Sequence, residues 1–290
     1  MSSQLKPLDM PVYNYWSALY KSFYSNLLYI DVGKRWKGLG LLYLFLVIGL
    51  LTIPYSLKIM EDFSVKFDNQ LIKPLEQIPP LYLQNGKISL DKPMPFLIKD
   101  DKNQVVIVID TTGKIKNFTN EYPAMHMLIT ADKLFFKPPV PQLLNQGNNS
   151  ATTTPNIHTF SPNMNGIFSG KQFVSEKRVA HLKWITQALL YPIFLALFCS
   201  IALVIFPILA LLAQFFTLVF FSFRLGYKQA CRLLIVSATP MLCVLFLFLC
   251  FNLMFSGTGV IITLLLVGYF SFAVVSLKRN SQLLSQDSKS

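Results

Sequence analysis

The sequence predicts an α-helical membrane protein with four transmembrane helices and a small extracytoplasmic α+β domain, built mostly from an antiparallel sheet. The chain is 53% apolar and 14% charged, and its apolar residues gather in blocks at 38–57, 184–223 and 233–277. Apolar blocks of about 18 or more residues without charge are typical of membrane spans. Cations flank the blocks, and a polar region with strand-like runs separates the first two.

Residues 1–37 are expected to lie in the cytosol and to contain an amphipathic helix at the membrane surface. Its apolar residues recur at three- and four-residue spacing: Trp16, Leu19, Tyr20, Phe23, Leu27 and Ile30. Such an aromatic face can lie in the inner headgroup layer or pack against the protein's own spans, and the pattern leaves both open.

The first span is expected at 38–57, with the N-terminus inside. Three cations precede it closely, and one lysine and two acids follow it: Lys34, Arg35, Lys37, Lys58, Glu61 and Asp62. Lys and Arg accumulate on the cytosolic side of short loops. The apolar run starts late and no small-residue cleavage motif follows it, which favours a retained anchor over a cleaved signal peptide.

The block 184–223 could hold one span or two. As one helix it would be about 60 Å long, twice the thickness of the hydrocarbon core. Residues 224–232 and the tail 278–290 both begin with cations, and a single span places both inside. We therefore expect one long span, tilted or kinked at Pro192 or Pro207.

The remaining layout follows from this choice, with both termini in the cytosol. We expect a cytosolic loop at 224–232, a third span at 233–251, a short outer loop at 252–259, a fourth span at 260–277 and a cytosolic tail at 278–290. The segments assigned to the cytosol hold 11 of the 26 Lys and Arg residues but only 3 of the 14 acids.

Residues 58–183 are expected to form the extracytoplasmic α+β domain. Asn85-Gly86 lies between two strand-like runs, a strong signal for a hairpin. The run from Val105 to Ile109 is consecutively β-favouring and apolar, which predicts a strand buried on both faces. Residues 143–170 are rich in Asn, Thr, Ser, Gly and Pro, and are expected to be a polar linker.

Charge and cysteine content exclude two classes of protein. The net charge of +12 does not form a basic stripe interleaved with aromatic residues, so contact with the bilayer surface explains it better than nucleic acid. The polar region has no cysteine, which excludes a disulfide scaffold. The four cysteines lie in or beside apolar blocks: Cys199, Cys231, Cys243 and Cys250.

Two short motifs invite a chemical interpretation that their context does not support. "DTTGK" at 110–114 occurs once, whereas aspartic proteases need paired carboxylates; a turn closed by Gly113 is expected. "MHM" at 125–127 contains donors suited to Cu(I). In a strand, however, Met125 and Met127 would face one side and His126 the other.

No catalytic, cofactor-binding or metal-binding residue is assigned from the sequence, and no cofactor is expected. The predicted spans carry no ionisable residue at hydrocarbon depth, which argues against a proton relay or intramembrane catalysis. Two glycosylation sequons, at Asn117 and Asn148, would matter only in a eukaryotic secretory setting.

Several segments resemble an uncharacterised family of bacterial multi-pass membrane proteins, a family classed as a domain of unknown function. They are "KRWKG" before the first span, "IPPLYLQNGKISLDKPMPFLIKDDKNQVVIVIDTTGK" and "MLITADKLFF" in the outer domain, and "GYKQACRLLIVSATP" at the third span. Some members carry a maltodextrin-utilisation label. The resemblance implies a bacterial cytoplasmic membrane and an outer sensory or interaction domain, and it brings no catalytic residue.

These observations favour a non-enzymatic binding, scaffold or sensory protein that acts through its extracytoplasmic domain. Its expected partners are the lipid bilayer and other membrane or envelope proteins. The alternative is a subunit or accessory of a membrane transporter, possibly for sugar uptake, whose path another chain completes.

Overall fold

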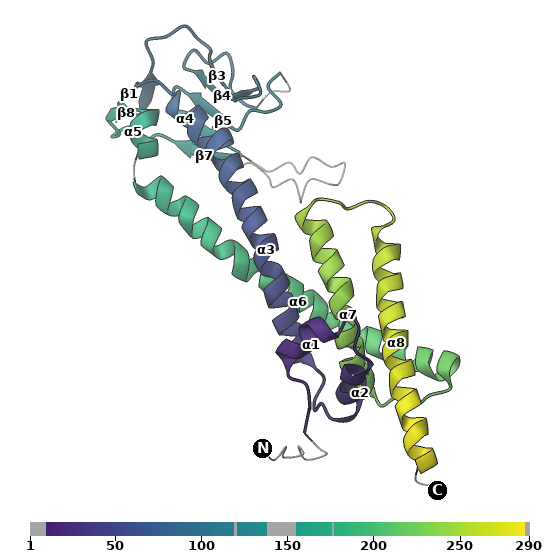
Figure 1. The fold of residues 1–290 in the computed structure, drawn as a ribbon. Helices are drawn as coiled ribbons and strands as arrows, with labels where there is room; N and C mark the ends of the chain where they lie inside the picture. Colours follow the sequence, from purple (N-terminus) through teal and green to yellow (C-terminus); the bar gives the residue numbers. More distant parts are fainter. Residues whose placement is uncertain (1–9, 119–120, 138–154, 176, 288–290) are drawn as a thin grey trace. The chain divides into compact units, whose positions relative to one another are not determined.

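The protein is represented by a computed structural model that describes residues 10–118, 121–137, 155–175 and 177–287 (Figure 1). These residues form two compact units. The helical unit comprises residues up to 59 and from 189 onward, and the sheet domain comprises residues 60–188. The expectation of a mostly helical chain with a small sheet region is confirmed.

Among the described residues, four helices are long and apolar enough to cross a membrane, as the sequence predicts. They are α3 (Leu41–Phe67), α6 (Lys177–Phe221), α7 (Tyr227–Cys250) and α8 (Thr258–Asp287). The block that could have held two spans is one helix, α6, of 45 residues. It is therefore about 68 Å long at 1.5 Å per residue, and it continues through both Pro192 and Pro207.

Helix α7 is the centre of the helical unit. In the most apolar stretch of α7, 61% is buried inside the protein, whereas in the corresponding stretch of α6 only 17% is buried. The Tyr43 hydroxyl of α3 lies 2.8 Å from the Thr239 hydroxyl of α7, a buried hydrogen bond between the two helices. Polar pairs of this kind commonly join membrane helices.

The N-terminal segment contains two helices where the sequence pattern predicts one. They are α1 (Tyr15–Lys21) and α2 (Asn26–Lys34). The break follows from Ser25, whose side chain accepts the Leu28 amide and starts a new helix. Leu28 and Tyr29 are fully buried, and Tyr29 lies edge-on to Phe272 of α8. Helix α2 thus packs against the spans, whereas Trp16 of α1 is 61% exposed.

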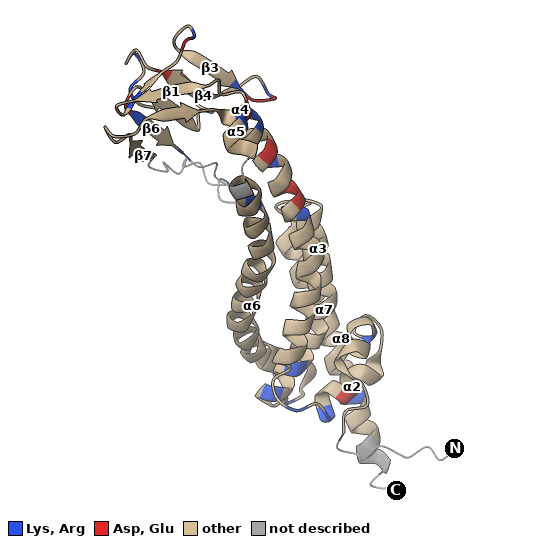
Figure 2. Cartoon of the chain, turned by 90° about the vertical axis from the view of Figure 1, so that its left-hand side faces the viewer, with Lys and Arg blue, Asp and Glu red and all other residues tan. Residues whose placement is uncertain are grey.

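Cations from several segments gather at one end of the helical unit (Figure 2). The Arg232 guanidinium of α7 donates to the carbonyl oxygens of Gly33 and Trp36 at the end of α2. Lys278 of α8 donates to the Phe221 carbonyl at the end of α6, at 2.8 Å. Carbonyl groups at helix C-termini carry partial negative charge, which these cations satisfy.

The loop before α7 is shorter than the predicted 224–232, because α7 begins at Tyr227. Arg232 therefore belongs to the second turn of this helix. A cation can lie within α7 at this position because the carbonyls at the end of α2 supply hydrogen-bond acceptors for the Arg232 guanidinium.

The sheet domain has two sheets. Sheet A has three strands in the order β2-β1-β8, and sheet B has five in the order β3-β4-β5-β6-β7. All pairings are antiparallel except β4 with β5. The strands are β1 (Leu81–Gln84), β2 (Lys87–Ser89), β3 (Phe96–Lys99), β4 (Val105–Asp110), β5 (Met127–Thr130), β6 (Lys133–Phe136), β7 (Asn156–Thr159) and β8 (Gly166–Phe168).

Short helical segments cover these sheets, and two of the sequence predictions hold here. The helical segments are the π-helical turn η1 (Asp68–Ile72), α4 (Lys73–Glu76) and α5 (Gly170–Ser175). The predicted hairpin joins β1 to β2, with positive φ at Asn85 and Gly86. Strand β4 is buried along nearly its whole length, as its apolar run predicts.

The prediction that residues 143–170 form a linker is wrong for the second half of this range. Residues 143–154, including the sequon at Asn148, lie outside the described residues. The rest supplies β7, which pairs with β6, and β8, which pairs with β1. Local composition could not reveal this, because both strands are edge strands that depend on partners distant in sequence.

The "DTTGK" segment is a turn organised by Asp110, as expected. The buried carboxylate accepts hydrogen bonds from the Thr112 amide at 2.9 Å and from the Ile115 amide at 2.6 Å. Burial acts to raise the pKa of Asp110, but the hydrogen bonds from the Thr112 hydroxyl and these amides outweigh it and lower the pKa.

We predict that Asp110→Asn destabilises the sheet domain by about 1–3 kcal/mol, because a neutral amide accepts these hydrogen bonds less well. Since the folded pKa is lowered, the stabilisation is full above the ordinary aspartate pKa and is lost as the pH falls through the lowered value. Hydrogen exchange of β4 in the full-length protein measures both effects. Asp101→Asn is the control, because its ion pair with Lys73 is exposed; an equal loss in both variants contradicts the prediction.

Gly170, the first residue of α5, permits a close approach to α4. A Cβ atom at this position would overlap the Leu75 carbonyl oxygen. We predict that Gly170→Ala destabilises the sheet domain by more than about 2 kcal/mol, seen as faster hydrogen exchange in α4 and β1. At Gly166 a Cβ would meet no atom within 4 Å, so Gly166→Ala should leave exchange unchanged.

Candidate functional site

The two faces of sheet B have different partners. Along β5 and β6, alternate side chains point to opposite faces. Leu128 and Phe135 pack with Val108 and Met125 in a cluster on one face. Met127, Ile129, Leu134 and Phe136 face the other way, and with His158 of β7 they form one wall of a cavity.

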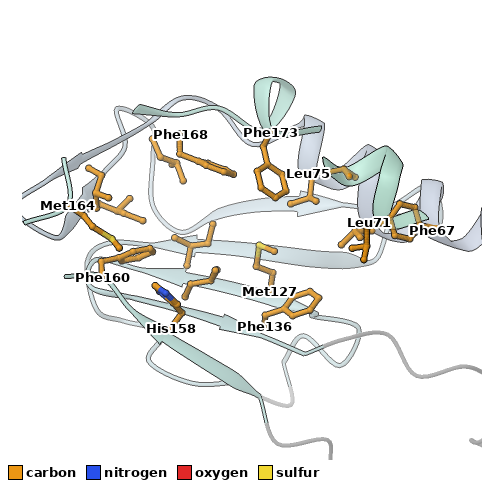
Figure 3. Close-up of a pocket in the computed structure, with 17 residues that line it drawn as sticks. Phe67, Leu71, Leu75, Met127, Phe136, His158, Phe160, Met164, Phe168 and Phe173 are labelled. Atoms are coloured by element: carbon orange, nitrogen blue, oxygen red, sulfur yellow. The ribbon is translucent and has the colours of Figure 1, made fainter. Parts of the chain in front are cut away.

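The opposite wall comes from sheet A and from the helical segments. Leu81, Leu83, Ile88 and Phe168 belong to sheet A. The helical residues are Phe67, Leu71, Leu75, Phe173, Val179 and Leu182. Figure 3 shows Leu75 and Phe173 across the cavity from Met127 and Phe136. Phe160 and Met164 complete the lining from the connection between β7 and β8.

The cavity has a volume of about 470 Å³ and is lined almost wholly by apolar side chains. Ligand sites typically measure about 300–1,000 Å³ and are mostly apolar. His158 is the one lining residue with an ionisable side chain, and it is exposed. An ordered water needs about two to four polar partners, and the lining side chains offer few. The cavity therefore favours an apolar occupant over water.

An ion pair joins α6 to the helical segment η1 beside the cavity. Lys183 of α6 donates to both carboxylate oxygens of Asp68 in η1, at 2.8 and 2.7 Å. The neighbouring residues Phe67 and Leu182 line the cavity. The Lys183 ammonium also lies 5.9 Å from the centroid of the Phe67 ring. These contacts position Phe67 and Leu182 in the cavity wall.

The side chains of the "MHM" motif do not converge on one site. Their arrangement nevertheless differs from the one that strand alternation predicts. Met125 and Met127 lie on opposite faces of sheet B, because Met125 belongs to the turn before β5 and does not follow the strand alternation. The His126 Nδ1 atom is buried without a hydrogen-bond partner. Burial, followed by the nearby Lys137, lowers the pKa of His126. Within the described ranges, no three or more His, Cys, Asp or Glu residues are grouped to hold a metal ion.

Sequence reasoning missed the cavity. The run of apolar residues in "MLIT" and in "KLFF" was the available signal, since consecutive apolar residues make both faces of β5 and β6 apolar. It did not indicate that one face would be left with a cavity, because sheet A and the helical segments that enclose it are far away in sequence.

Comparisons with known proteins identify a family without assigning an activity. A relative from Rickettsia prowazekii (strain Madrid E), named "Uncharacterized protein RP489", is 28% identical over 100 residues, which cover 31% of this chain and 35% of that protein. The match thus spans about a third of the relative's length. No solved structure matches the chain.

The family model described as "Protein of unknown function (DUF1189)" matches residues 16–274. This range includes α1 except its first residue, α2 to α7, the eight strands described above, the cavity lining and most of α8. The chain therefore belongs to the family of proteins of unknown function DUF1189.

Proposed function

We propose that this protein is a non-enzymatic, membrane-anchored binding protein whose sheet domain takes up an apolar ligand in the cavity. The observation that carries the proposal is the lining, in which apolar side chains from both sheets and from the helical segments enclose about 470 Å³. Apolar surface of this kind attracts ligands by removing their own apolar surface from water.

We further propose a bacterial cytoplasmic membrane, with both termini in the cytosol and the sheet domain outside. The support is the gathering of Arg232, Lys278 and Lys34 at one end of the helical unit, where Lys34 also donates to Asn280. Cations concentrate on the cytosolic side of membrane proteins.

We predict opposite accessibility for two engineered cysteines in a background without the four native ones. Lys102→Cys and Lys228→Cys are both at exposed positions. A membrane-impermeant maleimide should label Lys102→Cys in cells whose cytoplasmic membrane is intact, and Lys228→Cys only after that membrane is permeabilised. Labelling of both before permeabilisation would contradict the proposed orientation.

Filling the cavity should block the ligand. We predict that Leu134→Trp reduces labelling of β5 and β6 by a photoreactive hydrocarbon, a phenyldiazirine, by about tenfold. The larger indole ring occupies part of the space that the probe needs, and a loss of about 1.4 kcal/mol in probe binding corresponds to this factor. Mass spectrometry of the full-length protein in lipid nanodiscs maps the labels.

Two controls make this experiment specific. Labelling of the spans by the same probe should be unchanged in Leu134→Trp. Leu97 is 37% exposed and does not line the cavity, so Leu97→Trp should keep the labelling of β5 and β6. The binding proposal fails if the wild-type cavity peptides are not labelled above their level in Leu134→Trp.

A further inference from the structure

We infer that the ligand is a single-chain amphiphile, whose acyl chain fills the cavity and whose polar head lies against His158 of β7. The inference rests on the proposed function and specifies its ligand class. Three features carry it: the placement of His158 at one end of the cavity, the volume of the cavity, and its lack of other hydrogen-bond partners.

The cavity has chemically different ends. Figure 3 shows His158, Phe160 and Met164 at one end and the apolar Phe67 and Leu71 at the other. His158 is exposed, and its ring lies 6.1 Å from that of Phe160. A molecule that occupies the full length therefore meets the hydrogen-bonding ring of His158 at one end. At the other end it meets the apolar side chains of Phe67 and Leu71, beside which Lys183 and Asp68 bond to each other.

The strand register places His158 on the cavity face of sheet B. His158 pairs with Leu134. Directly opposed residues in an antiparallel pair point to the same face, and Leu134 lines the cavity. Because β7 is an edge strand of sheet B and His158 is exposed, a head group there keeps access to water.

The volume suits one acyl chain. Ligand sites typically measure about 300–1,000 Å³, and the cavity, at about 470 Å³, lies in the lower half of this range. A single acyl chain is a ligand of this size class.

The chemistry of the lining distinguishes an acyl chain from a peptide. A buried peptide needs hydrogen-bond partners for each of its backbone amides and carbonyls. The cavity side chains beyond His158 supply none, because they are aliphatic, aromatic or thioether groups. An acyl chain has no polar group to satisfy. Its head needs only the donor and acceptor that the His158 ring offers, which fits a carboxyl or hydroxyl head.

The chain itself brings the domain to a source of amphiphiles. Two of the lining residues at its borders, Phe67 and Leu182, belong to α3 and α6. Both helices contain candidate membrane spans. A domain tethered at both borders to a bilayer meets acyl-chain amphiphiles at high local concentration.

The test uses two photoreactive sixteen-carbon fatty acids with the full-length protein in nanodiscs. One carries its diazirine beside the carboxyl group, the other at the methyl end. We expect the first to label the segment from Asn156 to Met164, and the second to label Phe67 and Leu71. Identical labelling patterns, or labels confined to the spans, would overturn the inference.

A variant separates the head-group contact from simple apolar binding. His158→Phe keeps a flat ring and removes the hydrogen bond, so we expect the fatty acid to compete about threefold to tenfold less well against the hydrocarbon phenyldiazirine. Labelling by the phenyldiazirine itself should not change. His181→Phe is the matched control, because His181 does not line the cavity.

The outcomes distinguish the inference from the proposed function. If the phenyldiazirine labels the cavity but His158→Phe leaves fatty-acid competition unchanged, the proposed apolar site is supported. The inference that the ligand is an amphiphile is then contradicted. If the phenyldiazirine fails to label the cavity, the proposed function itself is contradicted. Organic extraction of protein purified from membranes should release an acyl-chain compound; a bound peptide in its place would overturn the inference.

Discussion

Burial of sheet B on both faces is the constraint on which the sheet domain depends. Its central strands β4 and β5 carry apolar side chains in both directions, so each face needs its own cover. One face is closed by Met125 and neighbouring residues from the turn before β5. The other face requires sheet A together with short helical segments. Covering a flat sheet with several short pieces leaves space between them, and this space is the cavity.

The close approach of α5 to α4 shows that the packing of these segments over sheet B depends on a specific backbone contact. Gly170 lies against the Leu75 carbonyl, where no Cβ atom fits. Phe173 and Leu75 can then both reach the cavity. The ion pair between Lys183 and Asp68 acts on the neighbouring segments in the same way. The cavity is thus enclosed by elements whose positions are fixed by specific contacts and not only by general apolar attraction.

The helical unit follows a different physical rule. Its long apolar helices satisfy their own backbone groups along their length, and only the groups at the helix ends need other partners. Here the cations of α7 and α8 bind the terminal carbonyls of α2 and α6. One interaction meets two needs, because it completes the hydrogen bonding of the helix ends and assembles positive charge on one end of the unit.

The sequence by itself determined the features that depend on local patterns. Apolar length indicated the four long helices, Asn85-Gly86 indicated its hairpin, and the run from Val105 to Ile109 indicated a buried strand. Each of these signals acts within a few neighbouring residues. The break between α1 and α2 was missed because a short serine cap competed with a continuous apolar spacing.

Tertiary structure alone decided β7, β8 and the cavity. The segment 155–170 has the composition of a linker, and it becomes two strands because β6 and β1 offer unpaired edges. His158 reaches the cavity only through this pairing with β6, across a long separation in sequence. A cavity is the space that packed elements fail to fill, so it depends on the final positions of distant segments, and no local pattern of residues encodes it.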